Sequence, residues 1–291
     1  MSDATEHSVS SRSLFDRYKW LVARRFSQLF ILSLFLLGPV SNNWIVTGNL
    51  SSSLTLNVLP LTDPFLLIQS FIAQQDIAET ALLGAAIVIV FYIIIGGRVY
   101  CSWVCPLNIA TDIAAWLRLK LNIKTSSLFH KTTRYWLFLA ILIMTFISGT
   151  LAWELVNPVS LVQRGIIFSL YLSAGVFFFI LFFDLFISRE AWCGHLCPVG
   201  VFYHLVGKFS LVRISAYHRD DCDRCNDCFT VCPEEQVIKP ALFGKLKNID
   251  PVILDGNCTN CGRCIDVCDR NVFKFTHRFN KKELLKSPGD Q

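Results

Sequence analysis

Four long stretches without a charged residue constrain the fold of this chain more than any other feature. They cover residues 26–62, 81–97, 135–153 and 165–183. A helix needs about 20 mostly apolar residues to cross the hydrocarbon core of a bilayer. Because 53% of the 291 residues are hydrophobic and only 17% are charged, buried helices of a soluble protein explain four such stretches poorly. The sequence therefore predicts an α-helical integral membrane protein with four transmembrane helices.

The basic residues lie unevenly around these stretches. Five occur in residues 1–25, none in residues 48–79, and only Arg164 between the third and fourth stretches. Cytoplasmic segments of membrane proteins are enriched in Lys and Arg, so both termini and all cysteine motifs are expected in the cytoplasm. No small-x-small cleavage site follows the first stretch, which is expected to be a retained anchor. The net charge of +5 follows from this bias, and we expect no nucleic-acid partner.

All twelve cysteines fall into four motifs on the predicted cytoplasmic side, where clustered cysteines usually bind metal rather than form disulfides. Two motifs read CDRCNDCFTVCP and CTNCGRCIDVC, the spacing of bacterial ferredoxins, in which the fourth cysteine of each motif binds the other cluster. Two zinc sites are the alternative, because C-x2-C pairs also suit tetrahedral zinc. We predict two [4Fe–4S] clusters, the first bound by Cys222, Cys225, Cys228 and Cys268, and the second by Cys258, Cys261, Cys264 and Cys232.

The other four cysteines form two C-x3-C-P motifs, in GGRVYCSWVCP and REAWCGHLCP. DPFLLIQ precedes the first motif and NPVSLVQ the second at nearly the same distance. This likeness predicts a tandem repeat of helix hairpins about an axis along the membrane normal. Cysteines four residues apart share one helix face, and the proline favours a helix end at the second cysteine. An additional metal or redox centre, a dithiol relay and inert thiols are the open alternatives for Cys101, Cys105, Cys193 and Cys197.

A quinone site would need an apolar slot at the membrane boundary with a few polar groups. The two repeated outer segments offer a carboxylate and amides, although such residues also simply begin interfacial helices. A carboxylate near the inner end of the fourth stretch is unusual, because charges inside a membrane are costly. The candidates for a quinone site are Asp63, Gln69, Asn157, Gln163 and Asp184.

The motifs GRVYCSWVCP and CGHLCPVG, four spans and a double ferredoxin motif together resemble the NapH/MauN family over nearly the whole chain. This family includes the membrane quinol dehydrogenase subunits of periplasmic nitrate reductase systems. The resemblance implies a subunit of the bacterial inner membrane that oxidises quinol from the membrane quinone pool. It implies electron transfer to a periplasmic ferredoxin-type partner of the NapG type, often with a multihaem cytochrome. The alternatives are a membrane-anchored iron–sulfur reductase or maturation factor for a metalloenzyme, and a redox-sensing regulator.

These observations divide the chain into four predicted parts. Residues 1–25 form a cytoplasmic segment, and residues 26–207 form the membrane domain with both C-x3-C-P motifs. Residues 208–279 form an α+β ferredoxin domain of the bacterial two-cluster type, and residues 280–291 a charged tail. Within the ferredoxin domain, LVRISA, VIKP and FKFTHRF are predicted to be strands.

Overall fold

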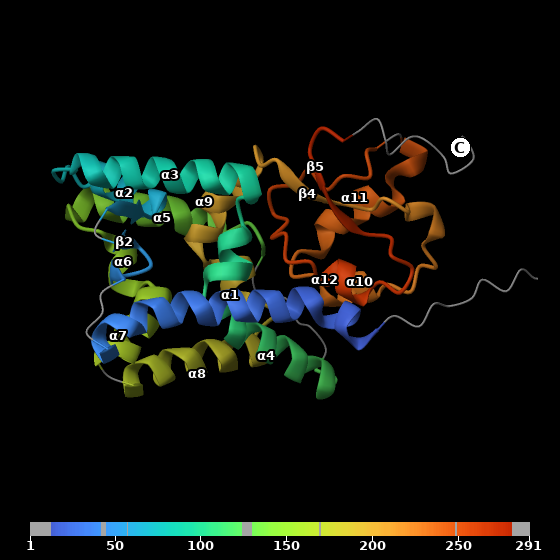
Figure 1. The fold of residues 1–291 in the computed structure, drawn as a ribbon, viewed down its shortest axis with the longest axis horizontal. Coiled ribbons are helices and arrows are strands. Elements are labelled where there is room, and N and C mark those ends of the chain that lie inside the picture. Colours follow the sequence, from blue (N-terminus) through green and yellow to red (C-terminus); the bar gives the residue numbers. More distant parts are fainter. Residues whose placement is uncertain are drawn as a thin grey trace, which may run out of the picture.

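The computed structural model describes residues 13–41, 45–56, 58–123, 130–168, 170–247 and 249–280. The helices from α1 to α9 form a bundle. A smaller part, with short helices and a two-stranded sheet, lies at one end of this bundle (Figure 1). Residues 1–12 of the predicted N-terminal segment and the predicted tail from residue 281 lie outside the described residues.

The first half of the bundle begins with a long helix and a small antiparallel sheet. These elements are α1 (Leu14–Ser41), β1 (Val46–Gly48), β2 (Ser52–Thr55) and β3 (Leu59–Thr62). The chain then forms a short helix, a long apolar helix, a π-helical turn and an amphipathic helix. They are α2 (Pro64–Ile72), α3 (Glu79–Ile95), η1 (Tyr100–Val104) and α4 (Leu107–Lys120).

The second half repeats this order of elements without the sheet. Its helices are α5 (Thr133–Ser148), α6 (Ala152–Val156), α7 (Pro158–Phe168), α8 (Leu170–Phe186), the π-helical turn η2 (Trp192–Leu196) and α9 (Pro198–Gly207). Equivalent hydrogen bonds begin the matching helices α2 and α7. The side chain of Asp63 accepts from the backbone N–H of Phe65, and that of Asn157 accepts from Val159, both at 3.1 Å. The helix after each C-x3-C-P motif packs on the other half, α4 on α8 and α9 on α3.

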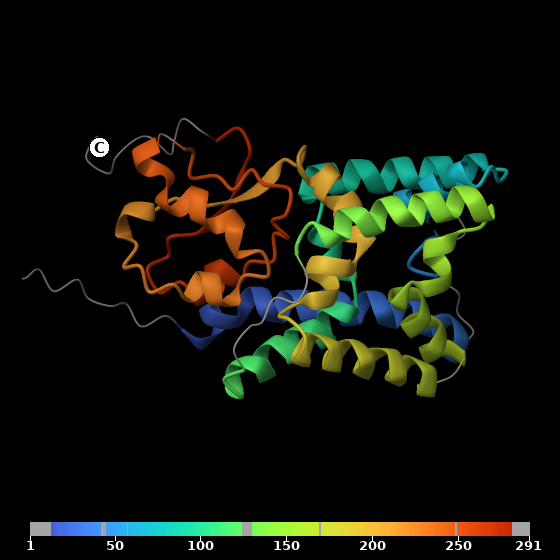
Figure 2. The same ribbon diagram turned by 180° about the vertical axis from the view of Figure 1, so that it is seen from behind.

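One helix of the described residues, Phe15–Gly38 within α1, is long and apolar enough to cross a membrane. By length, the structure therefore supports one of the four predicted transmembrane helices. Helices α3, α5 and α8 are apolar but have only 17, 16 and 17 residues. Glycines end two of them, since Gly96 follows α3 and Gly149, in the left-handed conformation, follows α5. These three helices run roughly parallel to α1 in the bundle, with α3 and α5 on the side opposite α1 (Figure 2).

The C-terminal part is held together by two strands far apart in the sequence. Strand β4 (Val212–Ser215) pairs antiparallel with β5 (Lys274–His277), from Val212 opposite His277 to Ser215 opposite Lys274. Between them lie the α-helices α10 (Asp227–Val231), α11 (Ile238–Phe243) and α12 (Arg263–Val267), and the 3-10 turns η3 (Arg219–Asp221), η4 (Glu235–Val237) and η5 (Gly244–Lys247). LVRISA and FKFTHRF thus contain the two strands of this sheet, as predicted.

The prediction of a strand at VIKP is wrong. Ile238 begins α11. The core buries Ile238, Ala241 and Leu242, which are spaced as on one face of a helix. Pro240 lies in the first turn of α11, where a missing N–H removes no helical hydrogen bond. The segment VIKP, which contains two β-branched residues, therefore forms helical turns and not a strand.

Candidate iron–sulfur sites

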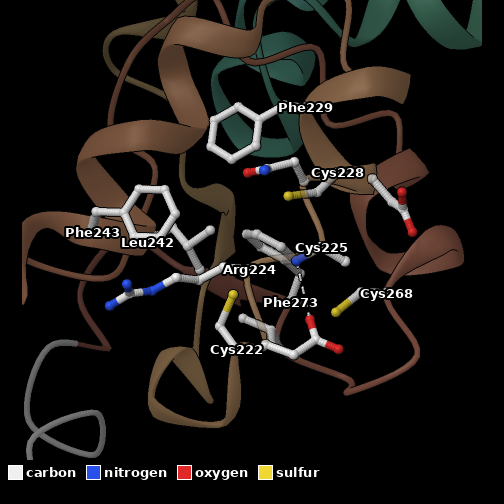
Figure 3. A pocket seen from close by; sticks show the side chains of 13 residues that line it. Cys222, Arg224, Cys225, Cys228, Phe229, Leu242, Phe243, Cys268 and Phe273 are labelled. Carbon is white, nitrogen blue, oxygen red and sulfur yellow. Dashed lines mark hydrogen bonds between the residues drawn. The ribbon is translucent and has the colours of Figure 1, made fainter.

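The C-terminal part contains a pocket lined by four thiols from both ferredoxin motifs. Cys222, Cys225 and Cys228 come from the first motif, and Cys268 follows helix α12 of the second. The sulfur atoms of Cys222, Cys228 and Cys268 point into the space between these residues (Figure 3). Leu242 and Phe273 add apolar walls to the pocket. The donor set, four thiols around one space, fits a [4Fe–4S] cluster.

A second pocket gathers the other four cysteines. Cys258, Cys261 and Cys264 of the second motif line it together with Cys232, which follows α10 of the first. The structure therefore sorts the eight cysteines into the two groups predicted from their spacing. That each group binds a cluster stays a prediction. Within the described part of the chain, no group of three or more Cys, His, Asp or Glu side chains is placed to hold a single metal ion.

The two motifs share an unusual backbone conformation that turns their thiols inward. Arg224 and Asn226 in the first motif have φ of 59° and 66°, and Asn260 and Gly262 at the equivalent positions have 47° and 75°. Left-handed conformations are unfavourable for residues with a side chain, at about 1–2 kcal/mol each. Their recurrence shows that the spacing C-x2-C-x2-C imposes the same turn twice.

Burial affects the protonation of these thiols in the chain itself. It raises the pKa of Cys228, with the nearby Cys268 adding to the effect, to about 12. Burial likewise raises the pKa of Cys258 to about 12. Since iron binds the thiolate, loading either pocket would release protons.

The second pocket lies against the helical bundle through the buried carboxylate of Glu234, two residues after Cys232. Arg98 and Arg134 donate to Glu234 Oε1 at 2.6 and 2.7 Å, and Lys131 donates to Oε2 at 3.1 Å. Burial alone would raise the pKa of Glu234, but these three cations together hold it well below its ordinary value. Three basic residues of the bundle thus converge on one carboxylate of the ferredoxin-type part.

The first C-x3-C-P motif contacts the same pocket directly. Ser102 Oγ donates to the carbonyl oxygen of Thr259 at 2.8 Å, and Trp103 Nε1 donates to that of Asn260 at 3.1 Å. Thr259 and Asn260 lie between Cys258 and Cys261. The residues of η1 are therefore within hydrogen-bonding distance of the loop that carries two predicted cluster ligands.

The C-x3-C-P segments are π-helical rather than α-helical. In each, the N–H of the second cysteine donates to a carbonyl oxygen five residues earlier, from Cys105 to Tyr100 and from Cys197 to Trp192. Each second cysteine has an extended backbone, with ψ of 120° and 114°, as a residue before proline favours. The helix ends at these positions as predicted, but the α-helical spacing assumed for the cysteine pairs does not occur.

The structure brings the two C-x3-C-P motifs together. Burial and the nearby Cys105 raise the pKa of Cys193 well above its ordinary value. Burial and the nearby Cys101 raise the pKa of Cys197 to about 12. Each thiol is thus perturbed by the other motif, as expected for two repeats that meet at one end of the bundle.

Comparisons with known proteins agree with this arrangement. A family profile described as "4Fe-4S binding domain" matches residues 78–124 and 158–215, each segment with one C-x3-C-P motif. A profile described as "4Fe-4S dicluster domain" matches residues 215–269. The methylamine utilization ferredoxin-type protein MauN of Methylorubrum extorquens is 47% identical over 275 residues, 94% of this chain and 95% of its own length.

Two ferredoxin-type proteins named NapH are similarly close. That of Haemophilus influenzae is 45% identical over 90% of this chain and 91% of its own length, and that of Escherichia coli is 39% identical over 96% of both. The chain belongs to the NapH/MauN family of ferredoxin-type proteins. Membership implies electron transfer through [4Fe–4S] clusters. No solved structure matches this member of the family.

In this NapH/MauN protein, four of the residues predicted for a quinone site lie where the two halves of the bundle meet. The side-chain oxygen of Gln69 accepts from Trp153 N–H at 3.1 Å, and that of Gln163 accepts from Leu50 N–H at 2.9 Å. Asp63 accepts from the hydroxyl of Tyr203 at 3.2 Å. The side-chain oxygens of these residues are thus satisfied within the protein, whereas the buried amide nitrogens of Gln69 and Gln163 have no hydrogen-bond partner among the described residues.

The other two candidates also make contacts within the protein. Asn157 donates to Ser160 Oγ at 3.2 Å, close to the contacts of Gln163. Asp184 lies apart from the other candidates and accepts from the backbone N–H of Trp192 at 2.9 Å, where it fixes the start of η2. The five predicted residues therefore do not form a single site.

Sequence reasoning missed the charged residues that join the two parts of the protein. Arg98 and Glu190 lie three residues before Cys101 and Cys193. Arg98 pairs with Glu234, and Glu190 pairs with Arg263 at 3.4 Å. The sequence does contain a signal for these pairs, because the two equivalent positions carry opposite charges beside apolar stretches. An unpaired charge is costly there, so each of the two residues is expected to have a partner of opposite charge.

Proposed function

We propose that the chain is a membrane electron-transfer subunit that oxidises quinol and passes electrons through two [4Fe–4S] clusters toward a periplasmic nitrate reductase system. The observation that carries this proposal is the contact between the membrane bundle and the pocket of Cys232, Cys258, Cys261 and Cys264. A cluster in this pocket would lie at the boundary of the bundle, while the pocket around Cys222 lies in the part of the domain away from Glu234. Two pockets in series suit transfer from a membrane donor to another protein.

The exposed side chains support four transmembrane helices. Besides α1, the helices α3, α5 and α8 each expose large apolar residues. These residues are Leu82, Leu83, Val90, Phe91 and Ile94 on α3, Trp136, Leu139, Ile143, Met144, Phe146 and Ile147 on α5, and Phe178, Phe179, Phe182 and Phe186 on α8. An apolar surface of this extent on several helices is typical of a membrane-embedded protein. The 16–17 residues of these helices lie at the lower end of the range for a span.

The contacts also support a cytoplasmic location for both ends of the chain. Arg17 pairs with Asp269 at 3.2 Å, and Trp20 packs edge-on against Phe275 at 4.6 Å between ring centroids. The basic start of α1 therefore lies on the ferredoxin-type part, together with both C-x3-C-P motifs. Because basic segments stay in the cytoplasm, this end of the protein faces the cytoplasm of a bacterial inner membrane, and the DP and NP segments lie toward the periplasm.

The chain's own residues set the conditions for the electron transfer. Bound clusters would each exchange one electron, so a pair can accept the two electrons of a quinol separately. Apolar side chains such as Leu242 and Phe273 line the first pocket, and the ion pairs of Glu234 fix the second pocket against the bundle. The partners are the quinone pool, a periplasmic ferredoxin-type protein of the NapG type and a multihaem cytochrome.

The purified protein in lipid nanodiscs tests this proposal. We expect about eight iron atoms per chain, four for each cluster, and reduction of the clusters by a menaquinol or ubiquinol analogue, followed by EPR. Clusters that only dithionite reduces, even with the periplasmic partner added, would contradict quinol oxidation. Iron clearly above eight per chain would place an additional centre at the C-x3-C-P motifs.

A second candidate function is electron supply or metalloenzyme maturation in methylamine utilization. It is favoured by the MauN proteins of Methylorubrum extorquens and Paracoccus denitrificans, which are 47% and 48% identical to this chain. Complementation separates the two. Restored nitrate reduction in a strain without its NapH supports the first candidate, and restored growth on methylamine in a strain without its MauN supports the second.

A further inference from the structure

A cavity of about 460 Å³ lies between the bundle and the ferredoxin-type part. Its walls come from the start of α1, from α4, and from α10 and α12. Helices α1 and α4 run below α10 and α12 in the view of Figure 1, so the cavity lies at their junction. A volume of about 300–1,000 Å³ is usual for a site that binds a small organic molecule.

Arg24 is one of the residues that line this cavity, and its guanidinium group makes no hydrogen bond to the described residues. Its side chain is only 1% exposed, and none of its three nitrogen atoms has a hydrogen-bond partner among the described residues. The nearest carboxylate oxygen, on Asp112, lies 3.6 Å away and also contacts Arg25, while its second oxygen pairs with Arg263. This ion pair compensates the charge of Arg24, but buried N–H groups without a hydrogen-bond acceptor are unfavourable. A ligand oxygen in the cavity would satisfy Arg24.

The charges around the cavity favour a neutral ligand. Four arginines and four aspartates line it, so it offers donors and acceptors but no net positive field. A phosphate or an anionic lipid headgroup would require an excess of positive charge. A quinone or quinol head group is neutral and has two oxygen atoms, which suits this lining.

Large apolar and aromatic side chains form part of the exposed lining at the mouth of the cavity, beside the exposed pair of Arg17 and Asp269. Trp116 and Leu119 on α4 are each 59% exposed, and Tyr18 on α1 is 53% exposed. Because α4 follows directly after the first C-x3-C-P motif at the end of a predicted span, these side chains lie at the membrane boundary. An isoprenoid tail could leave through this mouth into the bilayer while the head group stays beside Arg24.

The far wall of the cavity is formed by residues between predicted cluster ligands. Thr230 and Val231 lie between Cys228 and Cys232, and Arg263 lies between Cys261 and Cys264. A head group in the cavity therefore borders the ligand segments of both predicted clusters.

We infer that this cavity binds the quinone head group, with Arg24 donating to one of its oxygen atoms; this inference rests on the proposed function. Quinol would lose two electrons, one to each [4Fe–4S] cluster, and its two O–H bonds would break as two protons leave to water past the exposed Asp227 and Asp269 at the cavity wall. Arg24 would stabilise the negative charge that develops on the oxygen as its proton leaves. The site is thus at the inner boundary of the membrane rather than at the DP and NP segments.

Photolabelling with an azidoquinone tests the location without any turnover. The full chain in nanodiscs is illuminated with the probe, digested and mapped by mass spectrometry. We expect labelled peptides from residues 14–25 of α1 and 107–120 of α4, and loss of the label when excess menaquinol analogue competes. Labels confined to residues 50–72 and 151–165 would overturn the inference in favour of the outer segments.

Variants test the role of Arg24 in quinol oxidation. We expect Arg24→Met to weaken the apparent affinity for quinol about 10- to 100-fold, since a hydrogen bond to a charged donor is lost, and Arg24→Lys to recover part of it. Trp116→Ala at the exposed mouth should weaken it severalfold, whereas Trp136→Ala, on the equally exposed face of α5, should not. Iron content and reduction by dithionite serve as the check that each variant is folded and loaded.

The outcomes separate this inference from the proposed function. If quinol does not reduce the clusters of the unaltered protein, the proposed function fails. If quinol reduces them but Arg24→Met and Trp116→Ala bind and oxidise it normally, the function stands and the site inference is wrong.

Discussion

Replacing Glu234 by glutamine tests whether one buried carboxylate fixes the ferredoxin-type part on the membrane bundle. The change removes the charge that Arg98, Arg134 and Lys131 share, while the shape of the side chain is kept. Both guanidinium groups are buried, at 3% and 2% exposure, and breaking a buried pair by removing one partner usually costs about 3–5 kcal/mol. Arg98 and Arg134 keep hydrogen bonds to Asn257 at 3.2 and 2.8 Å, so we expect the lower end, about 3 kcal/mol.

The same carboxylate sets the direction of the pH dependence. The cations hold the pKa of Glu234 below its ordinary value despite burial, so the ionised form is stabilised in the folded protein. Its contribution is fully present above the unfolded pKa of about 4.3 and is lost as the pH falls through the lower folded pKa. Acid should therefore weaken the unaltered protein below about pH 4.3 and change Glu234→Gln less.

Thermal unfolding in nanodiscs at neutral pH measures the effect. A loss of about 3 kcal/mol corresponds to a decrease in melting temperature on the order of 6–12 °C for a protein of this size. Glu235→Gln is the matched control, because Glu235 is exposed and adjacent, and such surface changes stay within about 0.5 kcal/mol. Equal melting temperatures for the two variants would refute the structural role assigned to Glu234.

Three further predictions follow from the same geometry. Cys268→Ser and Cys232→Ser should each remove about half of the iron, but different EPR signals, because the two residues line different pockets; loss of the same signal in both would contradict the pairing. Gly97→Ala should prevent stable folding, since a Cβ there would lie 2.2 Å from the backbone of α9, whereas Gly175→Ala, with nothing within 4 Å, should express normally. Reporter fusions to the C-terminus should behave as cytoplasmic, with fluorescent GFP and inactive alkaline phosphatase, and the reverse result would invert the proposed orientation.

Local sequence patterns predicted those parts of the fold that depend on neighbouring residues. The C-x2-C-x2-C spacing identified three thiols of each group, because such a turn is determined within seven residues. The fourth thiol of each group, from the other motif, followed from the ferredoxin pattern and not from local structure. The short strands expected in a ferredoxin-type domain identified LVRISA and FKFTHRF, which contain the paired strands β4 and β5. At VIKP the same reasoning failed, because a short apolar run fits a helix turn or a strand equally well and only the packing of Ile238 and Leu242 decides.

The parts that were missed depend on contacts between segments far apart in the chain. The sequence predicts that Asp63 begins a turn, and Asp63 does cap the start of α2. Its contact with Tyr203, however, depends on how the second half of the bundle folds onto the first. The cavity beside Arg24 is likewise formed by five segments that only the tertiary structure brings together. In the sequence, Arg24 is one of several basic residues that appear only to mark the cytoplasmic side.

The two halves of the bundle are similar enough that the ferredoxin-type part could dock on them in two ways, since its own two motifs also repeat. Opposite charges at the equivalent positions Arg98 and Glu190 remove this ambiguity. Arg98 meets Glu234, which follows Cys232, and Glu190 meets Arg263, which precedes Cys264. In the other motif of each pair, the positions equivalent to Glu234 and Arg263 are Arg270 and Asp227. Docking with the two motifs exchanged would therefore place Arg98 near Arg270 and Glu190 near Asp227, and like charges placed against each other cost several kcal/mol. The charge difference between the repeats therefore selects which pocket lies against the bundle.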